Sequence, residues 1–394
     1  MPPRNVRRNG MRSVFQASST RRRFMLGSAT ALSSVLLANC TRNLRGTDAT
    51  AESPTAENPT TDEGTSAAAG DPGTLHIYTW SSYVDDELLQ AFEAETGIRP
   101  IVDIYDSNEV MLARMQAGGG NAYSIIYPSD YMVTEMIDLE MLTELDKSRL
   151  NGLSDLKAQW QSPVYDPDNT YSVPYAWGTT GLIYDPELVG EEISEWDYLW
   201  QNRDRLNRQI TLLNDVRETK GAALKYLGYS YNSTDPAEIE EAFNALMELR
   251  PAVANFLTNG WEDQLASGDL QVAMAYSVDA LSLIDEYPNL VYVIPREGSS
   301  VWTDTMVIPN TAPNVDAAYE WINFMLNSDN SAGLVERLKF STPLESAFNK
   351  LPNDLKADTD LFPPNEILEN CEGIAPIPQD ALELYDRYWT QLTS

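Results

Sequence analysis

The alternation of secondary structure is clearest in residues 74–105, which read TLHIYTWSSYVDDELLQAFEAETGIRPIVDIY. Thr74–Thr79 is rich in β-branched and aromatic residues, which is typical of a strand. Val84–Thr96 carries apolar residues at the helical spacing i, i+4, i+5, i+8 and stops at Gly97. Ile98–Tyr105 is again strand-like. This order of strand, helix and strand predicts a βα unit on a parallel sheet.

The same alternation continues along the chain. It predicts helices near 108–117, 131–139, 218–227, 236–249, 261–267 and 279–286, and strands at 123–127, 181–184, 210–213, 270–275 and 290–293. The pattern starts afresh after Tyr171, and the segment from Thr74 to Ser394 is long for a single core. We therefore expect an α/β fold of two lobes.

The composition excludes several classes of function. The chain of 394 residues has 59 Asp and Glu against 27 Lys and Arg, a formal charge of −32, whereas nucleic-acid-binding proteins need a basic surface. His76, Cys40 and Cys371 are its entire supply of His and Cys, too few for a typical zinc site or a His-dependent catalytic centre. We expect no metal, no cofactor, no catalytic residue and no enzymatic activity. The acidic balance favours a cationic ligand.

Residues 1–39 are predicted to be an export signal. They contain seven Arg and no acidic residue, and Met25–Ala38 is an apolar run too short to span a bilayer. Thr20–Met25 (TRRRFM) resembles a twin-arginine signal. Leu37–Cys40 (LANC) resembles a lipobox, in which Cys40 becomes the lipidated first residue, although Asn39 stands where a small residue is usual. The alternative is simple cleavage near Ala38.

Residues 40–73 are predicted to be a flexible acidic tether. Thr41–Gly73 consists mainly of small and polar residues and cannot bury enough apolar surface to fold. Removal of the signal would leave Cys371 as the only unmodified thiol, so we expect no disulfide in the exported fold.

Aromatic and acidic residues gather just after the predicted strands. They are Trp80-Ser81-Ser82-Tyr83, Ser129-Asp130-Tyr131, Asn214-Asp215-Val216-Arg217-Glu218 and Tyr276-Ser277-Val278-Asp279. The segment Val301-Trp302-Thr303-Asp304 adds another Trp and another carboxylate. Ligands of open parallel sheets bind beyond the carboxyl ends of the strands. Aromatic faces attract a cation and cover methylene groups, while carboxylates pair with each N–H. The pattern predicts a pocket for an organic ammonium ion.

Several stretches, in order along residues 75–392, carry a resemblance to a known family. They are 78–84 (YTWSSYV), 105–109 (YDSNE), 127–131 (YPSDY), 171–178 (YSVPYAWG), 213–236, and 302–304 (WTD) with Ile308-Pro309 after it. In these stretches the chain resembles the spermidine/putrescine-binding proteins, the extracytoplasmic receptors of polyamine ABC transporters. The resemblance implies a two-lobed periplasmic-binding-protein clamshell of type II with a parallel-rich sheet in each lobe. It implies one lobe at 74–178 continued by 304–348, and another at 179–303 continued by 349–394.

The resemblance also implies the residues that bind the ligand. They are Trp80, Ser81, Tyr83, Ser129, Tyr131, Asp215, Glu218, Tyr276, Asp279, Trp302, Asp304 and Phe340. Asp215 and Glu218 are expected to hold a terminal ammonium group. Trp302 and Asp304 are expected to hold a secondary or distal amine. Asp279 corresponds to a carboxylate of the putrescine-preferring members.

Two of these positions depart from the family pattern. Tyr276 stands where Trp is common, and Phe340 stands where Tyr is common, which removes one hydroxyl. A further polar contact is expected near the C-terminus, within 370–379, but the sequence does not place it.

Each acidic or aromatic position also has a structural explanation. Asp215 and Glu218 fit the N-cap and N3 positions of a helix, which is compatible with ligand binding. Asp279 fits a helix cap, and Trp80 and Trp302 fit core aromatics at strand ends. Their joint occurrence at strand ends, in the order of the family, favours a binding site.

These observations predict an exported receptor, anchored through Cys40, that captures spermidine, putrescine or both and delivers them to an ABC permease with its ATPase subunits. We expect a monomer that contacts the membrane only through its lipid and does not bind nucleic acid. The alternatives are a binding protein for another organic cation or for a ferric or other metal ion, and a carboxylate-based hydrolase. The hydrolase is disfavoured because Asp215 and Glu218 lie on one helical turn. Salt adaptation is an alternative explanation of the acidic composition.

Overall fold

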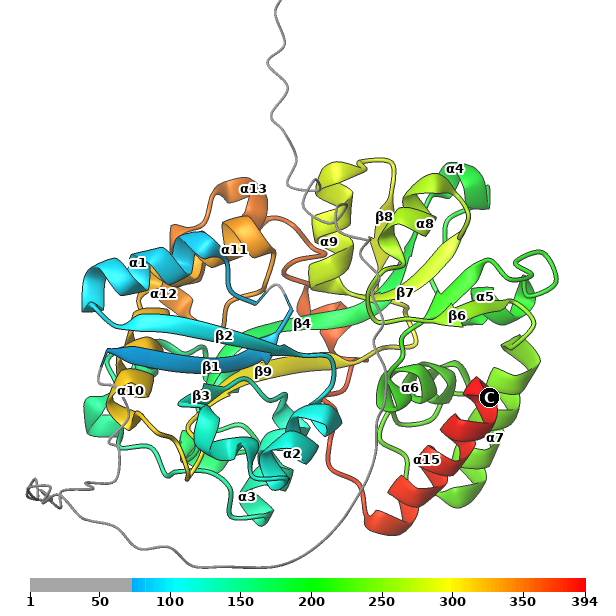
Figure 1. Ribbon diagram of the computed structural model, residues 1–394. Helices are drawn as coiled ribbons and strands as arrows, with labels where there is room; N and C mark the ends of the chain where they lie inside the picture. The colour runs from blue at the N-terminus through cyan, green and yellow to red at the C-terminus, as the bar shows by residue number, and fades with distance from the viewer. Residues whose placement is uncertain (1–72, 82) are drawn as a thin grey trace, which may run out of the picture. The chain divides into compact units, whose positions relative to one another are not determined.

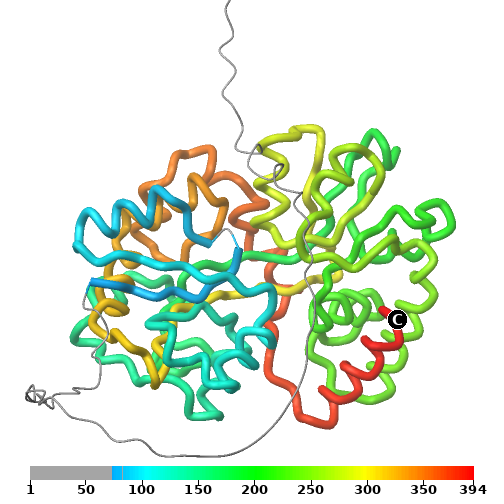
Figure 2. Tube along the Cα trace, viewed as in Figure 1, coloured from blue at the N-terminus to red at the C-terminus, as the bar shows by residue number. Residues whose placement is uncertain are grey.

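The computed structural model describes residues 73–81 and 83–394 (Figures 1 and 2). The predicted export signal, the lipidation site Cys40 and, apart from Gly73, the predicted tether lie outside the described residues. None of the helices within the described ranges combines the length and the apolar character needed to cross a membrane.

The first group of strands is parallel, as the sequence predicts. β1 (Thr74–Trp80) lies between β2 (Arg99–Tyr105) and β3 (Ile125–Ile126). Helices α1 (Asp86–Thr96), α2 (Asn108–Gln116) and α3 (Asp130–Asp138) follow β1, β2 and β3 in turn. α1 begins where Asp85 accepts the N–H of Leu88 and ends at Gly97, whose φ of 74° suits glycine. The predicted βα unit is confirmed.

Side chains of β1 alternate between two cores, one on each face of the sheet. Leu75 and Ile77 belong to a core with Phe92 of α1 and Trp321 of α10 (Val315–Met325), which we call the first core. Tyr78 points to the opposite face, where α2 and α3 supply Met111, Met115, Met132, Val133 and Met136. The period of two along a strand thus covers both faces of the sheet with helices.

A second group of parallel strands has the same arrangement. β5 (Ile210–Leu212) lies between β6 (Val253–Phe256) and β7 (Val272–Tyr276). One face packs against α6 (Val216–Tyr226), α7 (Pro236–Leu249) and α15 (Gln379–Thr393) in what we call the second core. The other face packs against α8 (Glu262–Ser267) and α9 (Ser277–Glu286). Short helices α4 (Pro186–Val189) and α5 (Asp197–Gln201) precede β5.

Two antiparallel strands join the two groups. β4 (Ser172–Tyr184) pairs with β9 (Val301–Val307) as far as Thr179 and with β7 from Thr180 onward. β8 (Val291–Val293) also pairs with β4. The path through the sheet is therefore β2-β1-β3-β9-β4-β7-β5-β6, with β8 beside β4 (Figure 1). Each group keeps three parallel strands, and the expected α/β fold with two parallel-rich regions is confirmed.

The sequence-based prediction missed most of these two joining strands. The prediction of 181–184 covers only the end of β4, and β9 was not predicted as a strand. Every residue of β4 is buried, so the strand lacks the alternation of polar and apolar residues that reveals a half-buried strand. Pro174 lies at a shift of the β4–β9 register, where the ladder tolerates a residue without an N–H.

The C-terminal part of the chain visits both cores. α11 (Ser328–Leu338), α12 (Glu345–Lys350) and α13 (Asn353–Lys356) follow α10, and Leu351 and Leu361 still belong to the first core. After α14 (Asn365–Leu368), the chain passes from the first strand group to the second, as the orange-to-red trace shows (Figure 2). The last helix, α15, places Tyr385 in the second core. The lobe boundaries remain a prediction, and this distribution favours a final crossing later than residue 349.

Candidate ligand-binding pocket

One pocket is lined by every residue that the resemblance assigns to the ligand. It encloses about 910 Å³, open mouth included, and its lining comes from both groups of strands. The residues not assigned from sequence are Tyr105, Asp106, Ser107, Asn108, Asp130, Asn214, Thr258, Asn259, Val278 and Ile374. The structure therefore brings the predicted residues together, and their contact with a ligand stays a prediction.

The ends of the parallel strands account for most of this convergence. Trp80 is the last residue of β1 and Tyr276 the last of β7. Ser129 is the N-cap residue of α3, and Asp215 that of α6. Carboxyl ends of parallel strands meet at one edge of a sheet, as expected for a ligand site. Asp304 is an exception, because it lies inside the antiparallel strand β9.

Asp304 is held by two hydroxyl groups. Tyr83 Oη donates to its Oδ2, and Ser129 Oγ donates to its Oδ1 at 2.6 Å. The residue is only 4% exposed, and burial raises the pKa of Asp304 to about 6 although both hydrogen bonds lower it. Ser129 and Asp304 also form a backbone bridge. The carboxylate is fixed in place but has no cationic partner among the described residues.

Asp215 and Glu218 occupy the first turn of α6, as the capping explanation predicts. Asp215 Oδ1 accepts the N–H groups of Arg217 at 2.8 Å and Glu218 at 3.0 Å. Burial, followed by the charge of Glu109, raises the pKa of the half-buried Asp215. The N-cap is therefore real. It leaves Oδ2 only a long contact of 3.4 Å from Tyr276 Oη.

Glu218 does not complete a reciprocal capping box. Its carboxylate turns to Tyr231 Oη, which donates to Oε2 at 2.6 Å, and to Ser300 Oγ, which donates at 2.8 Å. The side chain is 1% exposed, and burial together with the charge of Asp215 raises the pKa of Glu218 to about 7. Since no ion pair joins it to a described Lys or Arg, Glu218 is a buried acid without a counter-charge.

Asp279 does not cap α9. The helix starts at Ser277, Asp279 is its third residue, and the N-cap position belongs to Tyr276 without a side-chain hydrogen bond. The alternative explanation, that Asp279 is a helix cap, is therefore wrong. Burial, with a smaller effect from Glu262, raises the pKa of Asp279 to about 7.

Aromatic rings form the walls. Trp80 donates its Nε1–H to Tyr127 O at 2.8 Å and lies 4.6 Å from the Tyr105 ring, centroid to centroid. Tyr276 and Trp302 meet edge to face at 6.0 Å. Both Trp80 and Trp302 also pack against the first core, so the core explanation and the pocket position hold together.

Phe340 and Gly178 support two of these rings. Phe340 is buried and meets the Tyr83 ring edge to face at 4.6 Å. Trp302 lies directly over Gly178, since a Cβ at that position would be 2.2 Å from the indole. A close approach of this kind is possible only because glycine has no side chain.

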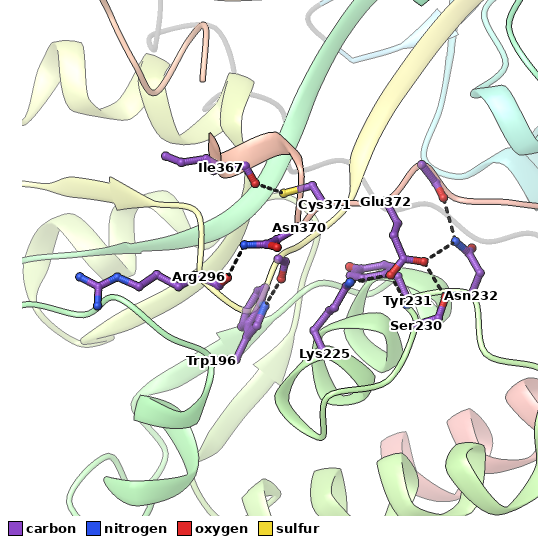
Figure 3. Close-up of polar contacts among 12 residues, drawn as sticks. Trp196, Lys225, Ser230, Tyr231, Asn232, Arg296, Ile367, Asn370, Cys371 and Glu372 are labelled. Carbon is purple, nitrogen blue, oxygen red and sulfur yellow. Dashed lines mark hydrogen bonds and ion pairs between the residues drawn. The ribbon is translucent and has the colours of Figure 1, made fainter. Parts of the chain in front are cut away.

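The C-terminal segment supplies Ile374, a lining residue that sequence analysis could not place. Glu372 anchors this segment: its Oε1 pairs with Lys225 Nζ at 2.5 Å, and Ser230 Oγ donates to Oε2 at 2.5 Å (Figure 3). The Glu372 backbone bonds to Ser299 and Val301, at the start of β9. In the expected 370–379 interval the structure thus brings an apolar residue to the pocket. No local signal in the sequence indicates these long-range contacts.

Other lining residues lay within the quoted stretches but were passed over. Asn108 Nδ2 donates to Ser129 Oγ and to Tyr131 Oη, both at 3.0 Å, so it orients two predicted residues. Tyr131 Oη in turn donates to Glu109 Oε1 at 3.0 Å. Asp130, the middle residue of YPSDY, is a buried acid in the lining. Asn108 and Asp130 could have been found from sequence, because each lies in a stretch that resembles the family and Asp130 is next to assigned residues.

The pocket as a whole is acidic and aromatic. Its lining carboxylates are Asp130, Asp215, Glu218, Asp279 and Asp304, which are buried or half-buried, and the exposed Asp106. No Lys, Arg or His is found among its lining residues within the described chain. Nowhere in residues 73–81 and 83–394 do three His, Cys, Asp or Glu side chains gather in a group able to hold a metal ion. The arrangement suits an elongated organic cation, with charge at the acids and methylene groups against the rings.

Comparisons with known proteins identify the family. Residues 87–363 match the model of the bacterial extracellular solute-binding proteins. The chain is 34% identical to the spermidine/putrescine-binding periplasmic protein 1 of Haemophilus influenzae, over 83% of this chain and 90% of that protein.

Two solved structures are similar over most of the fold. A putative spermidine/putrescine ABC transporter protein from Listeria monocytogenes has a TM-score of 0.76 and 36% identity, over 81% of this chain and 98% of its own. The spermidine/putrescine substrate-binding protein PotD from Streptococcus pneumoniae has a TM-score of 0.72 and 34% identity, with the same coverage. The fold is that of the type II periplasmic binding proteins. The chain belongs to the family of bacterial extracellular solute-binding proteins that includes the spermidine/putrescine-binding proteins.

Proposed function

We propose that this protein is an extracytoplasmic receptor that binds a polyamine in the pocket and delivers it to an ABC importer. The observation that carries the proposal is the set of six lining carboxylates, five of them buried or half-buried, with no basic residue in the lining. Buried carboxylates are destabilised unless a cation pairs with them, and a polyamine brings two or three. The relatives described above are named for binding spermidine and putrescine, which supports the same ligand class.

The carboxylates suggest how the ligand lies. One ammonium group would contact Asp304, which Tyr83 and Ser129 already orient. The other end would contact Asp215 and Glu218 at the start of α6. The methylene chain would lie against Trp80, Tyr83, Tyr131, Tyr276 and Trp302. Binding without bond making or breaking is sufficient to account for every group, and we propose no catalytic role.

Delivery requires that the importer distinguish a loaded receptor from an empty one. Contacts from both sides of the pocket favour the closed arrangement only to the extent that the ligand binds it more tightly than the open one. Asp304 on the joining strand β9 is held by Tyr83 and Ser129, which follow strands of the first group, whereas Glu218 lies on α6, which packs against the second. A ligand that reaches both would provide this difference. The permease and its ATPase subunits would then receive the closed form from a monomeric receptor.

Export and anchoring complete the proposal. The arginine-rich leader would direct export through the twin-arginine route, and Cys40 would carry the lipid. Incorporation of a labelled fatty acid into the wild-type chain, and its loss in Cys40→Ser, tests this. Equal labelling of both chains would argue against Cys40, and a chain without label would support simple cleavage near Ala38.

Calorimetric titration of the exported fragment tests the function. We expect saturable one-site binding of spermidine or putrescine, and no comparable heat with a monoamine, a sugar, Ca²⁺ or Fe³⁺. Binding of a metal ion or monoamine in preference to any polyamine would overturn the proposal. A thermal-shift panel of the same compounds provides an independent readout, because a ligand that binds only the folded state raises the unfolding temperature.

A further inference from the structure

The most buried of the lining carboxylates without a role in the arrangement proposed above is Asp130. Asp130 is the first residue of α3, lines the pocket and is 5% exposed. The N–H of Tyr131 donates to its Oδ1 at 2.8 Å. Among the described residues, no Lys or Arg forms an ion pair with it. A buried carboxylate in this condition is costly to ionise until a cation arrives.

Asp130 lines the pocket next to the residue that holds one of its ends. The neighbouring residue Ser129 holds Asp304 at one end. Burial raises the pKa of Asp130 well above its usual range, and the charges of Asp304 and Glu218 raise it further, which places both acids within electrostatic reach. Asp130 Oδ2 also lies near Gly373, where a Cβ would be 3.8 Å away, and glycine has no side chain to cover the carboxylate.

We propose that Asp130 is a ligand-binding residue that pairs with the secondary ammonium group in the middle of a triamine, and that it thereby selects triamines over diamines. This inference rests on the proposed function. Spermidine carries a charged NH₂⁺ between its two ends, where a diamine has only methylene groups. The triamine gives Asp130 a charge-assisted hydrogen bond, whereas a diamine leaves it buried with backbone N–H partners but no cation. Such a difference between two ligands is what selectivity requires.

A length-matched pair of ligands isolates the effect. Octane-1,8-diamine has the same chain length as spermidine but a methylene group in place of the secondary amine. Calorimetry on the wild type should show spermidine binding about 30-fold more tightly, the range expected for one hydrogen bond to a charged group. In Asp130→Asn, spermidine affinity should fall by about 30-fold and that of the diamine by less than about threefold, so the preference disappears.

Asp138→Asn is the matched control, because Asp138 is the exposed last residue of the same helix. It should leave both affinities unchanged. The unfolding temperature of unliganded Asp130→Asn should be at least that of the wild type, because a buried unpaired acid has been removed. Equal weakening of both ligands together with a lower unfolding temperature would mean a structural role and overturn the inference. Wild-type protein that binds both ligands equally would overturn it too, whereas failure to bind either would overturn the proposed function itself.

Discussion

The two carboxylate ends of the pocket are built in opposite ways. Asp215 and Glu218 lie three residues apart, and Asp215 is held by backbone N–H groups of its own helix. Asp304 is held by side chains of Tyr83 and Ser129, which are 221 and 175 residues away in the chain. The first end is local and exists once α6 forms. The second end exists only when β1, α3 and β9 are assembled, so its geometry depends on the whole fold.

The largest effect on ligand binding is expected from a substitution of Asp304. Asp304→Asn keeps the shape of the side chain but removes the charge that would meet an ammonium group. We expect polyamine affinity to fall by about 100-fold, since a desolvated charged hydrogen bond contributes about 1.5–3 kcal/mol. Calorimetry measures the loss. The exposed Asp204→Asn serves as control, and similar small effects for both variants would contradict the role of Asp304.

Gly178→Ala tests whether ligand binding tolerates a small displacement of Trp302, near Asp304. The added Cβ would be 2.2 Å from Trp302 and 2.5 Å from Ser277 Oγ, so the indole must move. We expect about 1–3 kcal/mol less stability toward denaturant, as usual for overpacking, and about tenfold weaker ligand binding. Chemical unfolding and calorimetry give the two numbers. Gly190→Ala, at the end of α4, is a control that adds a Cβ without a clash: nothing lies within 4 Å of that Cβ. Its φ of 82° should cost about 1 kcal/mol without affecting affinity. Unchanged affinity in Gly178→Ala would indicate that the position of Trp302 is unimportant.

The pH dependence separates the two ends. The folded-state pKa values of Asp304 (about 6) and Glu218 (about 7) are raised, so the empty protein should lose stability as pH increases from about 4 through about 7. Affinity for a polyammonium should increase as the acids ionise, and should level off above about pH 8, where Glu218 and Asp279 are fully charged. Calorimetry from pH 5 to 8 checks this.

Two variants show which acid is responsible for which part of the dependence of affinity on pH. Glu218→Gln should reduce the slope between about pH 6 and 8, with Asp279 accounting for what remains there, whereas Asp304→Asn should remove the part below about pH 6.5. A flat profile in the wild-type protein would contradict the raised pKa values.

Glu372→Gln should have the smallest effect. Its carboxylate pairs with Lys225 and accepts Ser230 Oγ, but the side chain is 29% exposed, so water replaces part of the loss. We expect about 1 kcal/mol less stability and about threefold weaker binding, because Ile374 is held less firmly. Glu369→Gln, an exposed residue of the same segment, is the control. A large effect on affinity without one on stability would suggest that Glu372 touches the ligand itself.

Features that depend on nearby residues were predictable from the sequence, whereas features that depend on distant contacts were not. The βα units were predictable, because strand and helix periodicity and caps such as Asp85 are written within about ten residues. The positions of the pocket residues were predictable from strand ends and family order. β4 was predicted only at its end, because burial of all its residues erases the periodic signal.

The residues missed in the pocket share one property. Asp130 sits at the start of a helix, where an acid is ordinary, and only the folded chain shows that it is buried beside Asp304 and Glu218. Ile374 reaches the pocket through contacts of Glu372 with segments more than 70 residues away. The burial of Asp130 and the position of Ile374 both depend on residues far away in the sequence, so neighbouring residues do not reveal them.

The uncompensated charge of the pocket has a consequence for traffic through a transporter. Two acidic walls repel each other, and the repulsion grows as they approach in a medium of low dielectric constant. An empty receptor with its acids ionised is thus disfavoured in the closed shape, and an incoming polycation relieves this repulsion. The same electrostatics would keep empty molecules from competing for the permease and wasting cycles of ATP hydrolysis.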